Sequence, residues 1–291
     1  MDNYLVRGVA ANGRVKAFGV LATDLVSEAQ KRHQSYPTAT AGLGRTLMGA
    51  LLLGSNLKNE DTLTLRVFGD GPLGGVIAQA NAKGEVRGYV QNPQVEVPPK
   101  SPGKLDVGKG IGEGHIYVTK DLGLKEPYTG MSPIVSGEIA EDLTHYLYQS
   151  EQVPSIVALG VLVDVDGSVI AAGGYIIQLM PGAEEDVISK LEQRVAEIPP
   201  ISNLIKAGQK PEEILDTLLG DMDLKILAHQ SVGFKCGCSK ERLEKILISL
   251  GEEELQGQIE VGQSEVSCHF CNEIYTFNKE ELESLLKEAK Q

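Results

Sequence analysis

The chain has 291 residues, of which 42% are hydrophobic and 23% charged, the composition of an ordinary globular protein large enough for two domains. A wholly disordered chain is therefore excluded. Its 27 basic and 40 acidic residues give a formal net charge of −13, so an anionic nucleic acid or membrane surface would on average be repelled.

Two further features bear on location. The most apolar stretch of the first hundred residues, Leu47 to Gly54, is far shorter than the roughly 20 residues that cross a bilayer, so we predict no membrane span. The chain begins Met1-Asp2-Asn3-Tyr4, without a basic region leading into an apolar run. We therefore expect no secretory signal and a cytoplasmic protein.

The first hundred residues carry the pattern of antiparallel sheets. Residues 4–9 and 14–20 flank Asn12-Gly13, a dipeptide that tolerates positive φ and favours a hairpin. Apolar and polar residues alternate from Thr62 to Phe68, which indicates a strand with one buried face. A second hairpin is predicted for residues 74–81 and 85–92, around Lys83-Gly84.

Between these strands lies a segment, Thr38 to Leu57, that is mostly Ala, Leu, Met and Gly. We predict a helix that is apolar nearly all round and hence buried. Gly42, Gly44 and Gly49 each cost about 1 kcal/mol relative to Ala in a helix, unless close packing requires a small residue.

The segment from Pro98 to Gly114 is rich in Gly and Pro, and it includes Gly108-x-Gly110-x-Gly112-x-Gly114. This spacing fits neither the G-x-G-x-x-G nor the G-x-x-x-x-G-K-[ST] phosphate loop, so we predict a flexible connector.

A helix over 137–149 is expected to follow. Residues 156–165 and 168–179 then form a hairpin around Asp166-Gly167, where the later ligands of a calcium loop are missing.

From Pro181 to about Val232 the sequence becomes charged and amphipathic, with breaks at Pro199-Pro200 and before Pro211. Its first apolar stripe consists of Val187, Ile188, Leu191 and Val195. We predict a helical linker with a narrow apolar face. Its helices must pack against neighbouring elements to be stable, because short isolated helices are marginal in water.

All four cysteines lie near the C-terminus, as Cys236-Gly237-Cys238 and Cys268-His269-Phe270-Cys271. Two close pairs of thiolates joined by a connector that can hold a helix are typical of a closed tetrahedral Zn²⁺ site. The flanking sequence predicts small elements around the two pairs. Ser239 can cap a helix that stops at Gly251, and Asn278 with Glu281 can cap a last helix.

The cysteine pattern leaves several interpretations open. It is compatible with a purely structural zinc ribbon, which could belong to a nucleic-acid-binding protein, although residues 232–291 carry 7 basic and 12 acidic side chains. A thioredoxin-like enzyme is disfavoured because no βαβ pattern surrounds the C-x-x-C. Like His33, His115, His145 and His229, His269 is expected to be a bystander, and we find no catalytic motif, so we expect no enzyme.

A redox switch is the third interpretation. A metal that holds both cysteine pairs is one long-range cross-link, and such sites supply roughly 10–16 kcal/mol of apparent folding energy. If each pair instead oxidised to its own small-loop disulfide, that cross-link would be lost, because small loops constrain an unfolded chain little. A small domain with about 5–15 kcal/mol of stability would then unfold.

Several segments together resemble one known family. The cysteine pattern is similar to that of the bacterial redox-regulated 33-kilodalton heat-shock chaperones. The resemblance extends over nearly the whole chain, through His33-Gln34 to Pro37, Ala41-Gly42-Leu43-Gly44-Arg45 leading into Leu57-Lys58, Gly69-Asp70-Gly71-Pro72-Leu73-Gly74-Gly75, Tyr128-Thr129-Gly130 and Ser150-Glu151-Gln152-Val153-Pro154-Ser155.

The resemblance implies a cytoplasmic, ATP-independent holdase that is inactive when reduced and zinc-bound. One Zn²⁺ per chain would be held by Cys236, Cys238, Cys268 and Cys271. Peroxide with heat, or hypochlorite, would then form the disulfides Cys236–Cys238 and Cys268–Cys271, release zinc and unfold the C-terminal region. The partners would be unfolding client proteins and, in the active form, a second copy of the chain.

Combining pattern and resemblance, we predict an α+β protein in three parts. Residues 1–180 form an N-terminal α/β domain with antiparallel sheets and a buried helix, residues 181–231 a helical linker, and residues 232–291 a small zinc-binding redox-switch domain. On oxidation, we expect the linker to lose structure together with the zinc domain and so expose apolar surface that binds clients.

Overall fold

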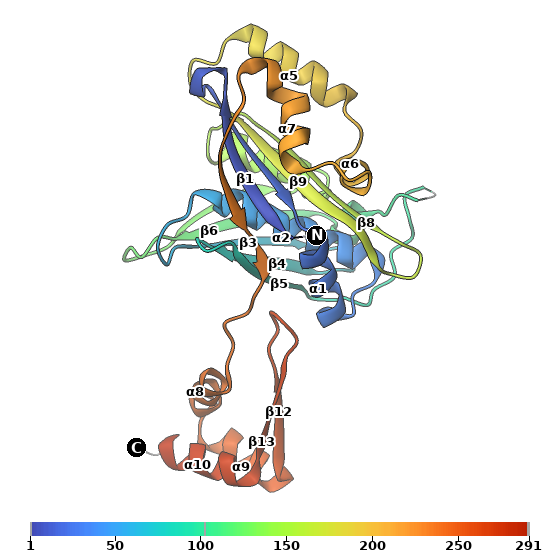
Figure 1. The fold of residues 1–291 in the computed structure, drawn as a ribbon. Coiled ribbons are helices and arrows are strands. Elements are labelled where there is room, and N and C mark those ends of the chain that lie inside the picture. The colour runs from blue at the N-terminus through green and yellow to red at the C-terminus, as the bar shows by residue number, and fades with distance from the viewer. Residues whose placement is uncertain (1, 102, 290–291) are drawn as a thin grey trace. The chain divides into compact units, whose positions relative to one another are not determined.

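The computed structural model describes residues 2–101 and 103–289 (Figure 1). It has mixed α and β structure with antiparallel sheets, as predicted, and divides into two compact units, Met1–Lys235 and Cys236–Gln291. In the described part of the chain, no helix combines the length and apolar character needed to cross a membrane.

The first sheet of the larger unit has five strands in the order β10-β1-β2-β9-β8, and all neighbouring strands are antiparallel. The predicted hairpins are confirmed, with Tyr4 opposite Leu21 in one and with Gly167 at positive φ in the turn of the other. The bounds are β1 (Tyr4–Ala10), β2 (Val15–Leu21), β8 (Ser155–Val163), β9 (Val169–Leu179) and β10 (Lys225–Ser231).

The second sheet has six strands in the order β11-β5-β4-β3-β6-β7. The strands predicted around Lys83-Gly84 and over 62–68 are present, whereas β6 and β7 were not predicted. The bounds are β3 (Thr62–Gly69), β4 (Gly75–Asn81), β5 (Glu85–Val90), β6 (Gly114–Asp121), β7 (Tyr128–Pro133) and β11 (Gly233–Phe234). β11 is the exception in direction, since it runs parallel to β5.

The buried helix is α2 (Pro37–Leu53), which packs against strands of both sheets. Two of its glycines are required by close packing: a Cβ at Gly44 would lie 2.7 Å from Val26, and one at Gly49 would lie 2.8 Å from Leu143. Both neighbours belong to the other helices of this layer, the unpredicted α1 (Thr23–His33) and the predicted α4 (Ala140–Gln149). The main core of the unit lies here.

Part of the Gly-rich segment is helical, which the sequence analysis did not predict. Residues Val107–Ile111 form a short helix, α3, in which Val107, Gly110 and Ile111 are buried. Its carbonyl groups accept hydrogen bonds from the backbone of the 69–75 loop, at 2.8 Å from Gly71 N and 2.9 Å from Leu73 N. The glycines therefore permit close approach of two backbones rather than mobility.

The predicted linker forms three helices, α5 (Glu185–Glu197), α6 (Ile201–Lys206) and α7 (Pro211–Leu219), which cover the face of the first sheet opposite α2 (Figure 1). These helices and the sheet face beneath them enclose a second buried core, to which Leu191, Ile205 and Leu215 belong. Residues 225–231 are the edge strand β10 rather than helix, because their backbone pairs with β1 through six residue pairs. The division of this region into an N-terminal domain (residues 1–180) and a linker (residues 181–231) stays a prediction.

The smaller unit is built from three helices and a hairpin. Seven apolar side chains form its buried core, among them Leu247, Leu255 and Phe277. Ser239 Oγ accepts from Arg242 N at the predicted cap, and Asn278 and Glu281 cap the last helix reciprocally. The bounds are α8 (Lys240–Leu250), α9 (Glu252–Val261), β12 (Gln263–Ser267), β13 (Ile274–Asn278) and α10 (Lys279–Ala289).

Candidate metal centre

The four cysteines come from two places in the smaller unit. Cys236 and Cys238 lie in the extended segment that precedes α8, and Cys268 and Cys271 lie in the turn between β12 and β13. Within that turn, the backbone N–H of Asn272 donates to the carbonyl of Cys268 at 2.7 Å, and Cys268 N donates to Glu273 O. The hairpin therefore fixes the second pair of cysteines.

The four Sγ atoms lie within 4.8 Å of one another. Across the two segments, Cys236 Sγ is 3.7 Å from Cys268 Sγ, and Cys238 Sγ is 3.3 Å from Cys271 Sγ. A tetrahedral Zn²⁺ with Zn–S bonds of about 2.3 Å separates its sulfurs by about 3.8 Å. The four cysteines could therefore hold one metal ion, and their soft sulfur ligands suit zinc.

Burial affects the protonation of this cluster. It raises the pKa values of the Cys268 and Cys271 thiols, since a buried site disfavours the thiolate. A metal ion that binds here must therefore displace protons.

One contact at the cluster was not predicted from the sequence. The Tyr275 hydroxyl, on β13, donates a hydrogen bond to Cys238 Sγ at 3.3 Å, and this bond is the main cause of the raised pKa of Tyr275. The contact depends on the β12–β13 hairpin, for which the cysteine spacing gives no signal.

The predicted bystander, His269, is exposed and does not belong to the group of four sulfurs. His33 is buried in the larger unit, where its Nε2 lies 3.0 Å from the carbonyl oxygen of Gly88. The structure thus brings together the four predicted cysteines, and neither of these two histidines belongs to the group.

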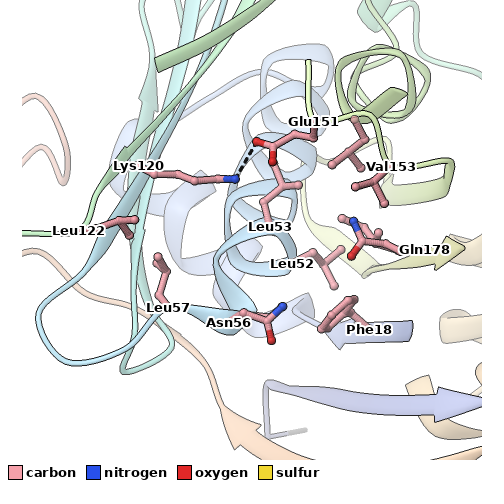
Figure 2. A pocket seen from close by; sticks show the side chains of 13 residues that line it. Phe18, Leu52, Leu53, Asn56, Leu57, Lys120, Leu122, Glu151, Val153 and Gln178 are labelled. Atoms are coloured by element: carbon pink, nitrogen blue, oxygen red, sulfur yellow. Dashed lines mark hydrogen bonds and ion pairs between the residues drawn. The ribbon is translucent and has the colours of Figure 1, made fainter. Parts of the chain in front are cut away.

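A separate cavity of about 290 Å³ lies in the larger unit, beside the C-terminal end of α2 (Figure 2). Lys120 and Glu151 form an ion pair of 2.7 Å in its wall, and Glu151 also accepts a hydrogen bond from the buried Tyr146 hydroxyl at 2.8 Å. Burial is the main cause of the raised pKa of Tyr146. Because these groups satisfy one another, we regard the cysteine cluster as the better candidate site.

Comparison with known proteins finds one family along nearly the whole chain. A family model described as Hsp33 protein matches residues 3–278. The 33 kDa chaperonin of Desulforamulus reducens is 53% identical over 292 residues, which cover 100% of this chain and 99% of the relative. That of Bacillus subtilis is 52% identical, with 97% and 98% of the two chains covered.

Structural comparison leads to the same family. The crystal structure of the 33 kDa chaperonin from Thermotoga maritima matches with a TM-score of 0.93 at 38% identity, covering 99% of each chain. Sequence and structure agree over practically the whole length. The chain therefore belongs to the Hsp33 family of heat-shock chaperones.

Proposed function

We propose that this protein is a redox-regulated, ATP-independent holdase that is inactive when reduced and metal-bound and is activated by oxidation of its cysteines. The observation that carries the proposal is the convergence of four Sγ atoms within 4.8 Å in a unit whose buried apolar core has only seven side chains. So small a core gives the unit little stability of its own, so its folding depends on the cross-link.

In the reduced form, Cys236, Cys238, Cys268 and Cys271 hold one Zn²⁺ per chain. The zinc supplies a cross-link between the segment before α8 and the β12–β13 turn. The protein contributes the pre-arranged β12–β13 turn and the Tyr275 hydrogen bond, which orients Cys238. The sulfur separations support this ligand set, since they bracket those of a tetrahedral site.

Oxidation forms the disulfides Cys236–Cys238 and Cys268–Cys271. With hydrogen peroxide, four thiolates give four electrons to two peroxide molecules, whose O–O bonds break as two S–S bonds form. Four protons from solvent complete four water molecules, and Zn²⁺ is released. Both disulfides close very small loops, so the long cross-link is lost and the unit unfolds.

Opening of the linker then exposes the client-binding surface. The apolar residues of α5, α6 and α7 and the sheet face that they cover form a core of their own, whose exposure would create a large apolar patch. Unfolding proteins are the clients, and the active form is a homodimer. We place the protein in the cytoplasm, and because its thiols respond stoichiometrically we do not assign it an enzymatic activity.

The direct test is light scattering from a thermally unfolding model protein without ATP, with reduced and oxidised protein side by side. Suppression of scattering by the oxidised form alone is the expected result. Equal suppression by both forms would refute redox control, and no suppression by either form would refute the holdase assignment.

A further inference from the structure

Residues 225–235, which we call the strap, cover the edges of both sheets in the larger unit. The strap contains β10, the outermost strand of the five-stranded sheet beside β1, and β11, the outermost strand of the six-stranded sheet beside β5. It ends directly before Cys236. A single segment, directly before the smaller unit in the sequence, therefore keeps two sheet edges paired. We call the smaller unit the metal-binding unit from here on.

The part of the strap that lies on β1 is held mainly by strand pairing. Two side chains add contacts, since Ile226 packs partly buried against the core under α5, α6 and α7, and Gln230 Nε2 donates a hydrogen bond to Ala82 O at 2.9 Å. β10 pairs with β1 through six residue pairs, from Tyr4 opposite Ser231 to Val9 opposite Lys225. None of the seven residues of β10 is buried, and Leu227 is 65% exposed. The edge of β1 thus accepts an extended chain chiefly through main-chain pairing.

Further side-chain contacts hold the C-terminal end of the strap. Val232 is 8% exposed in the main core, and the Phe234 ring lies 5.6 Å from the Arg32 guanidinium. The Lys235 side chain forms an ion pair of 2.5 Å with Glu85, and the backbone N–H of Lys235 donates a hydrogen bond to Val86 O. Once the metal-binding unit is unfolded, this end becomes the end of the folded chain, where fraying begins.

A cavity lies beside the covered edge. It has a volume of about 540 Å³, and its lining includes Tyr4, Leu21, Ile205, Lys210, His229 and Gln230. Strand-addition sites commonly combine main-chain pairing at a sheet edge with pockets that receive alternate side chains of the added strand. Of this lining, Tyr4 on β1 and Leu21 on β2 belong to the sheet itself, so they remain beside the edge when the strap and the linker helices leave.

We propose that the outer edge of β1 is a docking surface for an extended segment of an unfolding protein, and that the strap covers this edge in the resting protein. The occupant is an extended polypeptide because the strap itself is one, and its seven β10 residues add no buried side chain. The inference rests on the proposed function, since it requires that oxidation unfold the metal-binding unit.

Hydrogen exchange of the full-length oxidised protein tests the docking surface, with reduced and carboxymethylated α-lactalbumin as a permanently unfolded client. We expect amides in residues 4–9 to exchange at least about tenfold more slowly when the client is bound, while residues 225–231 remain unprotected. Capture of the client without protection of residues 4–9 would overturn the proposal. So would protection that needs no client and rises with protein concentration, because the occupant would then be a second copy.

A peptide with the sequence of residues 225–235 provides an independent test. It should slow client capture by the oxidised protein, whereas the same peptide with methyl groups on alternate backbone nitrogens should not, since it lacks the N–H donors. Equal effects of the two peptides would contradict recognition through the backbone.

Variants of the strap test its covering role. Phe234→Ala should shorten the oxidation time needed for client capture by about tenfold, and the milder Lys235→Glu by up to about fivefold. Lys58→Glu is the matched control, because Lys58 is an exposed lysine of the larger unit that lies outside the strap and outside the β4–β5 hairpin. Lys235→Glu decides the question if Phe234→Ala does not fold, and an oxidation time equal to that of the wild type would refute the covering role.

The two proposals fail in different ways. If the oxidised protein captures no client, both are wrong. If it captures the client while residues 4–9 stay paired with the strap, the holdase assignment stands and only the β1 docking surface is refuted.

Discussion

The Sγ atoms of Cys238 and Cys271 lie 3.3 Å apart, although 33 positions separate the two residues. This contact, with the similar one between Cys236 and Cys268, runs across the two chain segments rather than within either C-x-C or C-x-x-C motif. A metal ion at this point therefore ties together the two segments of a unit that has only a small core of its own.

Loss of one ligand should abolish stable metal binding. We expect reduced Cys268→Ser protein to contain much less than one zinc per chain, since three thiolates and a hydroxyl bind Zn²⁺ less tightly than four thiolates. Metal analysis after gel filtration measures this, and His269→Ala, which alters an exposed neighbour, should retain its zinc. Full zinc retention by the Cys268→Ser protein would argue against the four-thiolate site.

Oxidation should give Cys236–Cys238 and Cys268–Cys271, even though the reduced cluster brings sulfurs of different segments close together. Once the metal leaves, near neighbours in the chain meet far more often than partners separated by a long connector. Peptide mapping by mass spectrometry identifies the bridges, with alkylated reduced protein as the control. A dominant Cys238–Cys271 bridge would show that the long cross-link survives oxidation.

Metal affinity should fall as the pH is lowered. Burial raises the pKa values of Cys268 and Cys271, so their thiols are protonated at neutral pH in the metal-free protein and protons compete with the metal. We expect the apparent affinity to drop by up to about tenfold per competing thiol for each pH unit. Competition with a chromophoric chelator at pH 6 and pH 8 tests this, and equal affinities would contradict it.

The Tyr275 hydroxyl should help to retain the metal. Tyr275→Phe removes the hydrogen bond to Cys238 Sγ while preserving the ring, and we expect about tenfold weaker zinc binding and faster release to a chelator. Thr276→Val, at the exposed next position of β13, is the control. Unchanged release from Tyr275→Phe would show that the hydroxyl does not influence the metal.

Two glycines of α2 should respond differently to the same change. A Cβ at Gly44 would lie 2.7 Å from Val26 and 2.9 Å from Val161, so Gly44→Ala should destabilise the larger unit by about 1–3 kcal/mol. At Gly42 the nearest atoms would be 3.7 Å away, so Gly42→Ala should be neutral or stabilising by up to about 1 kcal/mol. Thermal unfolding of both variants provides the comparison, and equal midpoints would refute the packing argument.

The parts of the fold that could be predicted are those that local sequence determines. The caps at Ser239 and at Asn278 with Glu281 follow from residues three positions apart, and the buried α2 follows from its continuous apolar composition. The spacing within each of the two cysteine pairs is likewise visible in the local sequence. In each case, one short stretch contains the whole signal.

The parts that were missed lack a clear local pattern, and some of them depend on distant partners. The edge strand β7 contains exposed Tyr128 and Met131, and no residue of β10 is buried, so neither carries the apolar alternation of a core strand. β7 is held by pairing with the neighbouring strand β6, whereas β10 is held by pairing with β1, far away in the sequence. The same is true of Tyr275, whose contact with Cys238 exists only because the hairpin folds back on the segment before α8.

The five-stranded sheet separates two cores through the alternation of its side chains. Leu5 belongs to the core shared with α2, while its neighbour Val6 belongs to the core under α5, α6 and α7. Because successive residues of a strand point to opposite faces, the outer helices can leave without removing a side chain from the inner core. Opening of the outer helices, as proposed above, would therefore leave every side chain of the inner core in place.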